Sequence, residues 1–395
     1  MSAAARPDLS FLPLLALAGF ASGAGMRVLD PLLPLIAADF RVSVSSAAAM
    51  LAGFSLAYGA GQLVTGPLGD RWGKLRVACL ALLAYGVGIA ACALAWDLPS
   101  MVVLRTVTGL LAGAIIPLAI AWIGDAVPYS ERQATIGRFL TGMVMAQLLA
   151  GPVSGAMAEL FGWRVSFLVL ALLAIGVGAA LAFRLGASAW RAGPSQAQRG
   201  LGLSQYVVLL RKPAGRRLMI AGFVDGFALF GGAFPFVGAF LIEGFSTSAA
   251  VAGLVVAGFG LGALAYTRLA GRLVKAAGER GLVLIGGALL AATLLALALV
   301  PDWHLVVAIQ AVSGFGFYMF HGVLQARATE ALPEARATAV SAFALVLFLG
   351  QSAGALAFGA VLALGGYRMV FALAAAVTLA LALWTRAVML GRAPS

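Results

Sequence analysis

The chain of 395 residues is 63% apolar, and only 10% of it is Asp, Glu, Lys or Arg, against roughly a quarter in a soluble domain. So few charges could not cover the surface of a soluble fold of this length, which excludes a cytosolic enzyme and a secreted domain. The two cysteines exclude a disulfide framework and a cysteine-based zinc cluster, and we expect neither a cofactor nor a metal.

Twelve apolar segments follow one another along the chain, joined mostly by short loops. Each is long enough to cross the hydrocarbon core of a bilayer, which takes about 20 residues of helix. They therefore predict an all-α polytopic membrane protein with twelve transmembrane helices in a lipid bilayer. The segments are residues 11–38, 46–69, 76–95, 100–124, 134–160, 166–185, 217–243, 248–269, 281–300, 304–326, 337–363 and 368–390.

The lysines and arginines predict the orientation of these helices. If the N-terminus is cytoplasmic, nearly all of the 26 fall in cytoplasmic loops and tails, whereas Arg41, Arg164 and Arg368 fall in outer loops and Arg27 and Arg105 inside helices. This asymmetry predicts that both termini are cytoplasmic, in a bacterial-type inner membrane. The net charge of +12 is then a topology signal, and we expect no nucleic-acid partner, because that would need a soluble basic face.

The chain divides into two similar halves. A polar, basic stretch at 186–216 predicts a cytoplasmic linker between an N-terminal six-helix bundle, 1–185, and a C-terminal one, 217–395; residues 201–212 are expected to form a short helix at the membrane surface. Matches between the halves recur at one offset, which indicates a parallel repeat, a known transporter design. The matches are Gly66 with Gly271, Gly73 with Gly278, Asp97 with Asp302 and Gly109 with Gly314, each 205 apart, and Gly162-Trp163-Arg164 with Gly366-Tyr367-Arg368, 204 apart.

The loop between the second and third segments carries the most specific motif. It reads Gly66-Pro67-Leu68-Gly69-Asp70-Arg71-Trp72-Gly73-Lys74-Leu75-Arg76, and its glycines permit tight turning and close helix contact. It resembles the Gly-x-Leu-x-Asp-Arg-x-Gly-Arg-Arg loop of the major facilitator superfamily, with one departure at Leu75. The resemblance implies that this loop governs closure of an inner gate, whereas the alternative is a topology anchor without a gating role. The implied gating residues are Gly66, Asp70, Arg71, Gly73 and Lys74.

An arginine inside the fourth segment is the next candidate. Arg105 lies about five residues from a helix end, where a charge is costly in lipid and normally faces a cavity or a carboxylate. The sequence Arg105-Thr106-Val107-Thr108-Gly109 resembles the superfamily's fourth-helix Arg-x-x-x-Gly motif, which is linked there to proton coupling. The matching residue in the other half is Gln310, so the fold itself does not require the charge. The alternative is an arginine that snorkels to the outer interface.

The fifth segment contains Gly151-Pro152-Val153-Ser154-Gly155-Ala156. Proline removes a helical hydrogen bond and kinks the helix, and small residues allow a close neighbour. The sequence resembles the tail of the antiporter motif of drug:proton exporters, Gly-Pro-x-x-Gly-Gly. Gln147 and Ala156 depart from that pattern. The resemblance implies Gly151, Pro152 and Gly155 as an antiporter-like motif and favours export over import.

The first segment holds the densest polar group, around Arg27 and Asp30. Three residues apart, they share one helical face, and the superfamily places the first and fourth helices on the central cavity. Asp30 is therefore expected to pair with Arg27, with Arg105, or with each in turn. Since a desolvated carboxylate gains proton affinity when an arginine leaves it, the group suits a proton carrier. The alternative is a permanently ionised pair that only holds helices together.

The second half adds Asp225 and His321, which also fall in helices that the superfamily places on the cavity. Histidine is a plausible proton acceptor near neutral pH, although a lone histidine on an apolar face often only hydrogen-bonds to backbone, and Asp225 is alternatively an interface group. We take Asp225 and His321 as further candidates for proton coupling. The candidates for substrate binding are Arg27, Asp30, Gln147, Phe234, Tyr318 and Gln351.

The resemblance spans essentially the whole chain and implies alternating access by two rocking six-helix bundles. A phosphate-cradling Gly-x-x-x-x-Gly-Lys-Ser/Thr loop is missing from the sequence, which argues against ATP drive. We therefore expect no enzyme but a monomeric, proton-coupled exporter of small organic molecules, with protons and lipid as further partners. The alternatives are a symporter or facilitator that imports a metabolite, and a non-transporting sensor or scaffold. The two interior arginines suit an anion and Asp225 suits a cation, so the charge of the substrate stays open.

Overall fold

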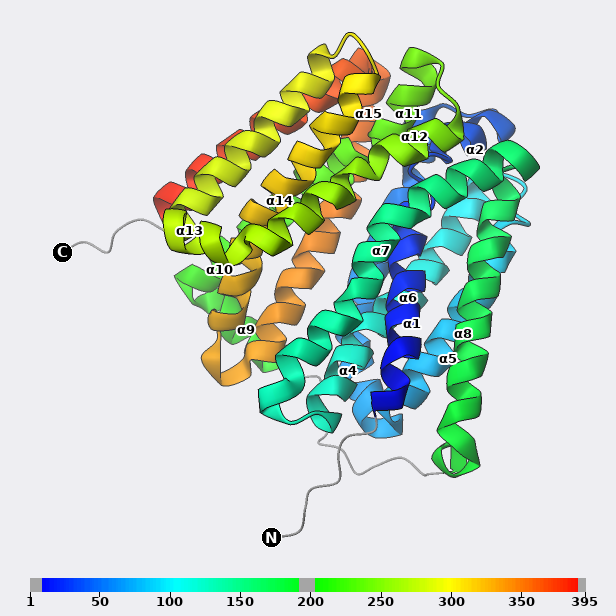
Figure 1. The fold of residues 1–395 in the computed structure, drawn as a ribbon, viewed down its shortest axis with the longest axis vertical. Coiled ribbons are helices and arrows are strands. Elements are labelled where there is room, and N and C mark those ends of the chain that lie inside the picture. The colour runs from blue at the N-terminus through cyan, green and yellow to red at the C-terminus, as the bar shows by residue number, and fades with distance from the viewer. Residues whose placement is uncertain (1–8, 192–202, 390–395) are drawn as a thin grey trace, which may run out of the picture.

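The computed structural model describes residues 9–191 and 203–389, and these residues are helical nearly throughout (Figure 1). The middle of the expected linker, 192–202, lies outside them. The N-terminal half contains α1 (Leu12–Arg27), α2 (Leu33–Asp39), α3 (Val44–Ala47), α4 (Ala49–Trp72), α5 (Lys74–Cys92), α6 (Leu98–Ala126), α7 (Tyr129–Phe161) and α8 (Trp163–Arg191). The C-terminal half contains α9 (Leu203–Arg211), α10 (Pro213–Asp225), the π-helix η2 (Gly226–Ala233), α11 (Phe234–Phe245), α12 (Ala249–Val256), α13 (Gly258–Leu299), α14 (His304–Glu330), α15 (Arg336–Trp384) and the π-helix η4 (Thr385–Met389). Short 3₁₀ turns occupy Leu9–Phe11 and Pro333–Ala335.

Ten helical stretches of the described chain are long and apolar enough to cross a membrane. Two of them, of 51 and 52 residues, are too long for one crossing. Each contains a glycine with positive φ, Gly278 (60°) in α13 and Gly366 (71°) in α15, where the helical path is interrupted. Division at these glycines gives twelve crossings, in agreement with the expected twelve-helix fold.

Two of the expected continuous helices are interrupted in the structure. The segment predicted as one helix over 11–38 ends as α1 at Arg27, passes through turns at 28–32 and restarts as α2. Pro31 has no N–H to donate, which breaks the regular pattern of helical hydrogen bonds there. The segment predicted over 217–243 likewise changes from α10 to the π-helix η2 and then to α11. Interruptions of this kind are frequent at functional sites.

Matching glycines turn the chain at the same places in both halves. Gly73 and Gly278 have φ values of 91° and 60°, and Gly162 and Gly366 have 87° and 71°. A left-handed backbone of this kind is readily available to glycine and strained for other residues. An aspartate also stands near both equivalent helix starts, with different hydrogen bonds: Asp97 caps α6 and accepts from Ser100 N at 2.9 Å, whereas Asp302 accepts from His304 N at 3.0 Å. The two six-helix bundles of the fold therefore share local geometry as well as sequence.

Close helix contacts also repeat at the 205-residue offset. A Cβ added to Gly109 of α6 would lie 2.2 Å from the carbonyl oxygen of Phe54 in α4. The equivalent Cβ on Gly314 of α14 would lie 2.0 Å from the carbonyl oxygen of Phe259 in α13. Both glycines let two backbones touch, as small residues do in membrane helices.

The two bundles touch at one end of the molecule and pack separately at the other (Figure 1). We call the end with α2, α11 and α12 the upper end, and the end where α1 begins the lower end. One buried apolar cluster at the upper end joins both bundles and includes Leu29, Ile36, Phe236 and Val256. At the lower end the buried clusters are separate, one wholly in the C-terminal bundle and two wholly in the N-terminal bundle. The described conformation is therefore closed at its upper end.

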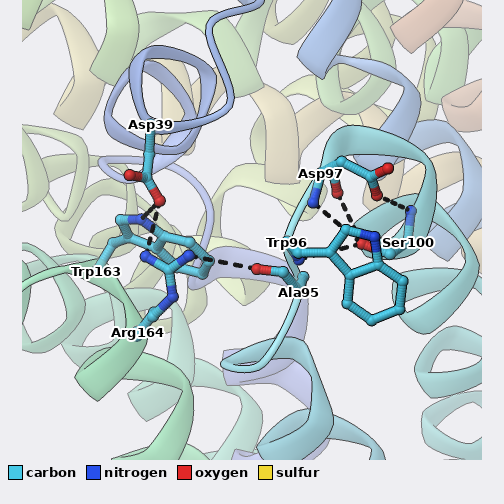
Figure 2. Close-up of polar contacts among 7 residues, drawn as sticks. All are labelled: Asp39, Ala95, Trp96, Asp97, Ser100, Trp163 and Arg164. Atoms are coloured by element: carbon cyan, nitrogen blue, oxygen red, sulfur yellow. Dashed lines mark hydrogen bonds and ion pairs between the residues drawn. The ribbon is translucent and has the colours of Figure 1, made fainter.

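At the upper end an aromatic side chain hydrogen-bonds to a carboxylate at equivalent positions in the two bundles. Figure 2 shows Asp39 accepting from Trp163 Nε1 at 3.1 Å and from Arg164 Nη1 at 2.7 Å, while Arg164 also reaches the carbonyl of Ala95. The Arg164 hydrogen bond holds the pKa of the Asp39 carboxyl below its ordinary value. In the C-terminal bundle the Tyr367 hydroxyl donates to Glu243 at 2.6 Å. Both acids and both aromatic residues stand 204 positions apart.

Candidate functional site

A small cavity lies where the two bundles meet, between the interrupted helices and α4, α6 and α15. Its volume is about 20 Å³, which is room for a single water molecule. The described conformation therefore holds the site closed around its polar groups. The lining residues are Met26, Arg27, Asp30, Leu51, Phe54, Ser55, Arg105, Phe230, Pro235, Gln351 and Ala355.

Arg27 and Asp30 form a buried ion pair beside the interruption of the first transmembrane segment. Arg27 Nη1 lies 3.6 Å from Asp30 Oδ2, and the two residues are 7% and 2% exposed. Asp30 N donates to the carbonyl of Arg27 at 3.0 Å, a tighter turn than the α-helical one. The backbone at Asp30 contacts α11 of the C-terminal bundle, since a Cβ on Gly238 would lie 2.0 Å from the Asp30 carbonyl oxygen. The pair thus lies on backbone that touches both bundles.

Arg105 enters the same cavity from α6 and is fully buried. Its Nη2 donates to the carbonyl of Gly25 at 2.8 Å, and its guanidinium lies 4.1 Å from the ring centre of Phe54. Full burial contradicts the alternative of an arginine that snorkels to the interface. Its hydrogen bond goes to a backbone carbonyl of α1, so the expected direct pairing with Asp30 is not the contact in this conformation.

Two arginines in this cavity have guanidinium nitrogens that make no hydrogen bond within the described chain. Among the described residues, Nε and Nη1 of both Arg27 and Arg105 are buried without a hydrogen-bond partner. Arg27 instead lies over Phe230 and Phe234 of the C-terminal bundle, at 4.9 and 4.8 Å from the ring centres. Such cation–π contacts attract the guanidinium, but each buried unpaired donor still costs about 1–3 kcal/mol.

Asp225 and His321 form a second buried pair within the C-terminal bundle. His321 Nδ1 lies 2.6 Å from Asp225 Oδ2, with side chains 11% and 3% exposed. The imidazole also stacks on Phe317, 4.8 Å between ring centres. Asp225 is the last residue of α10 before the π-helix η2. The structure joins two residues that the sequence analysis treated separately, and neither is among the residues that line the cavity.

The gating candidates lie at the lower end of the N-terminal bundle. Asp70 and Arg71 occupy the last turn of α4, and Gly73 turns the chain so that Lys74 starts α5. Lys74 Nζ lies 3.6 Å from Asp70 Oδ1 and also contacts Asp125 at the end of α6. The loop thus connects three helices of one bundle at the end where the two bundles pack separately.

The antiporter-like motif lies on the seam between the bundles. A Cβ on Gly155 of α7 would lie 2.2 Å from the carbonyl oxygen of Ala249, at the start of α12. One turn away, a Cβ on Gly253 would lie 2.2 Å from the carbonyl oxygen of Gly151. Gly151, Pro152 and Gly155 therefore let α7 and α12 approach closely, and they do not face the cavity.

Two of the substrate-binding candidates lie at the cavity besides the ion pair: Gln351 lines it, and Phe234 covers Arg27. Gln147 and Tyr318 are not among the residues that line it. The sequence analysis missed Phe54 and Phe230, which lie against the two arginines. Phe230 stands four residues before Phe234, the spacing that places two side chains on one helical face, and that spacing was the available signal.

Twelve crossings in two bundles, with buried charges where the bundles meet, define the fold of a secondary membrane transporter. The model of the Major Facilitator Superfamily matches residues 15–241 and 218–394. The chain belongs to the Major Facilitator Superfamily.

Individual relatives share moderate identity with the chain. It is 26% identical over 342 residues to the uncharacterized MFS-type transporter YceJ of Bacillus subtilis (strain 168), covering 85% of each chain. It is 33% identical to the uncharacterized MFS-type transporter YwfA of the same organism over 150 residues, 38% of this chain and 36% of that protein. It is 27% identical to the 4-hydroxybenzoate transporter PcaK of Pseudomonas aeruginosa over 170 residues, 43% of this chain and 38% of that protein.

Solved structures show the same fold at lower identity. A bacterial homolog of the human lysosomal transporter Spinster has a TM-score of 0.76 and 19% identity, covering 100% of both chains. A D-xylose–proton symporter has a TM-score of 0.75 and 18% identity, covering 95% of this chain and 96% of that one. At this level of identity the structures establish the fold alone.

Proposed function

We propose that the chain is a proton-coupled secondary transporter of small organic molecules, with Arg27, Asp30 and Arg105 at its coupling site. One observation carries the proposal: a carboxylate and two arginines are buried in a cavity between two bundles whose buried apolar clusters join at one end and are separate at the other, within the described residues. A group of this kind is costly in a membrane and has no use in a scaffold. Separation of the bundles would admit water beside Asp30 and withdraw the Phe230 and Phe234 rings from Arg27, which changes the surroundings of the carboxylate and so its affinity for a proton.

The gating proposal concerns the lower end, which we assign to the cytoplasm from the lysine and arginine distribution. Asp70, Arg71 and Lys74 then form part of an inner gate, with Gly66 and Gly73 shaping the loop. The proposal is supported by their place at the end where the bundles pack separately. We further propose a monomer in a bacterial-type inner membrane, with the bundles divided at 186–216.

For direction, export is our first candidate, based on the resemblance of Gly151, Pro152 and Gly155 to the exporter motif. The second candidate is import of a metabolite by proton symport. Relatives with named substrates include a 4-hydroxybenzoate transporter.

The experiment is transport into proteoliposomes that contain the purified full chain, with labelled 4-hydroxybenzoate as the first probe and a panel of drug-like compounds beside it. Each compound is offered with a pH gradient of either direction and with none. Accumulation against a concentration gradient that follows the pH gradient supports the proposal, and its direction separates the two candidates. Equilibration unaffected by pH identifies a facilitator, and a panel that yields no transport favours a sensor; both results overturn proton coupling.

A further inference from the structure

The charges around the cavity do not balance. Arg27 and Arg105 bring two positive charges, and Asp30 is the one carboxylate among the lining residues. Four of the guanidinium nitrogens, Nε and Nη1 of each arginine, are buried without a hydrogen-bond partner among the described residues. One of them, Arg27 Nη1, forms the ion pair with Asp30 at 3.6 Å, which leaves three without either kind of contact to a carboxylate. Both side chains are more than nine-tenths buried. The cavity therefore presents several unused charged donors to whatever enters it.

Asp225 does not make the cavity a cation site, because it is already paired within its own bundle. That carboxylate was the reason to consider a cationic substrate, because it would make the inner half of the pathway acidic. In the structure its Oδ2 lies 2.6 Å from His321 Nδ1, inside the C-terminal bundle. A carboxylate held by an imidazole is a poor site for a cation, and the pair is not part of the cavity lining.

We propose that the cavity binds a small organic anion, whose carboxylate or similar acid group pairs with Arg27 and Arg105. The guanidinium fork matches a planar acid group, and the bond between two ionised groups is among the strongest hydrogen bonds in proteins. Phe54, Phe230 and Phe234 surround the two arginines and suit an apolar or aromatic body attached to the acid. This inference gives the substrate class for the proposed transport function and rests on it.

The small volume of the cavity implies that the bundles separate before a substrate binds. A space of about 20 Å³ holds no organic anion, so binding follows separation of the bundles. The rings that cover Arg27 belong to η2 and α11 of the C-terminal bundle, whereas Arg27 belongs to α1. Separation at this point withdraws the aromatic cover and leaves the unused nitrogens open to the anion.

A charge series on one ring tests the inference without any transport step. Binding to the purified full chain in lipid nanodiscs is measured by calorimetry and by the shift in unfolding temperature. The probes are 4-hydroxybenzoate (anion), 4-hydroxybenzamide (neutral), 4-hydroxybenzylamine (cation) and inorganic phosphate. We expect the anion to bind at least about tenfold more tightly than the amide, because an ionised acceptor strengthens each hydrogen bond, and the amine not to bind.

Variants locate the effect. Arg27→Gln and Arg105→Gln should each reduce the preference for the anion over the amide by about tenfold, while Arg184→Gln, at an exposed arginine of α8, should leave it unchanged. Equal or tighter binding of the amide or amine overturns the inference, as does an anion preference that survives both cavity variants. If phosphate binds as tightly as the aromatic acid, the inference that the site recognises an apolar or aromatic body is wrong. If none of the probes binds, the inference of a site for aromatic acids is wrong.

Failure of this inference is separate from failure of the proposed function. If the acid binds at the arginines but a pH gradient never drives its transport, proton coupling is wrong and the anion site stands. If a pH gradient drives transport of a cation, the anion site is wrong and proton coupling stands.

Discussion

His321 and Asp225 are joined by a hydrogen bond of 2.6 Å between Nδ1 and Oδ2, although they stand 96 positions apart in the chain. The bond ties α14 to the point where α10 becomes the π-helix η2, and the stacked Phe317 ring covers the imidazole. Both partners belong to one bundle, so the contact persists when the bundles move relative to each other. Because neither residue is among those that line the cavity, we propose a structural role for this pair.

Removal of one partner of this pair should destabilise the protein. His321→Gln leaves a buried carboxylate with a weaker partner and should lower the free energy of unfolding by about 1–3 kcal/mol. The double variant with Asp225→Asn should recover part of that loss in a double-mutant cycle. Thermal unfolding in detergent measures the stability, and binding at several pH values measures coupling. If His321→Gln instead abolishes the pH dependence of binding, the proton is carried here.

Asp30→Asn should abolish pH-driven transport while substrate binding and downhill exchange persist. The amide keeps the shape of the side chain but cannot exchange a proton, so the linkage between proton and substrate is lost. Binding should also lose most of its pH dependence. The measurements are uptake and exchange in proteoliposomes and binding at pH 5.5, 7 and 8.5. An unchanged pH profile together with unchanged driven uptake would place the carrier elsewhere, and Asp225 would be the next residue to test.

The Arg105→Gln variant should fold and insert into the membrane as the parent does, but lose uphill transport. The fold tolerates glutamine at the equivalent place in the other half, where Gln310 is 1% exposed. The variant lacks the charge that acts on Asp30 and loses the hydrogen bond to Gly25. Size-exclusion profiles check folding, and pH-driven uptake checks function. Uphill transport at the parent rate would make Arg105 structural.

Asp70→Asn should slow transport several-fold while substrate affinity stays within a few fold. The carboxylate lies at the lower end beside Lys74, remote from the cavity, so it bears on the gate and not on substrate contacts. Asp125→Asn, which removes the other acid at Lys74, is the matched comparison for the ion-pair cluster. Initial rates and binding constants provide the test. Weakened affinity with an unchanged maximal rate would contradict a gating role.

Asp39→Asn should reduce stability near neutral pH and have no effect in acid. Arg164 lowers the pKa of Asp39 in the folded protein, so the pair stabilises the fold above the ordinary value of 3.8, and this is lost as the pH falls through the folded value. The side chain is 40% exposed, so solvent screening limits the effect to at most about 1 kcal/mol. Unfolding temperatures of parent and variant from pH 7 to pH 3 should converge. A constant gap would contradict the assignment.

Hydrophobic runs and charge distribution predicted the fold, because lipid demands long apolar helices with charges between them. The same signals could not show the interruptions at 28–32 and at η2, since composition there remains apolar and only packing decides the backbone path. Arg27, Asp30 and Arg105 stood out because buried charge is rare in such segments. The rings of Phe54 and Phe230 did not, since aromatic residues are common throughout, and the Asp225–His321 contact depends on how two distant helices are rotated.

The glycine corners described above have a mechanical consequence. At Gly73, Gly162, Gly278 and Gly366 one helix passes into the next through a single residue with positive φ, and each of these corners lies within one bundle. If the bundles rock as proposed, we expect part of the displacement to be taken up where a helix is itself interrupted, at 28–32 and along η2. Those two stretches supply or adjoin Arg27, Asp30 and Phe230 of the cavity. We therefore expect the backbone that bends between conformations to be the same backbone that contacts the substrate, so that the bound substrate favours one arrangement of the bundles over the other.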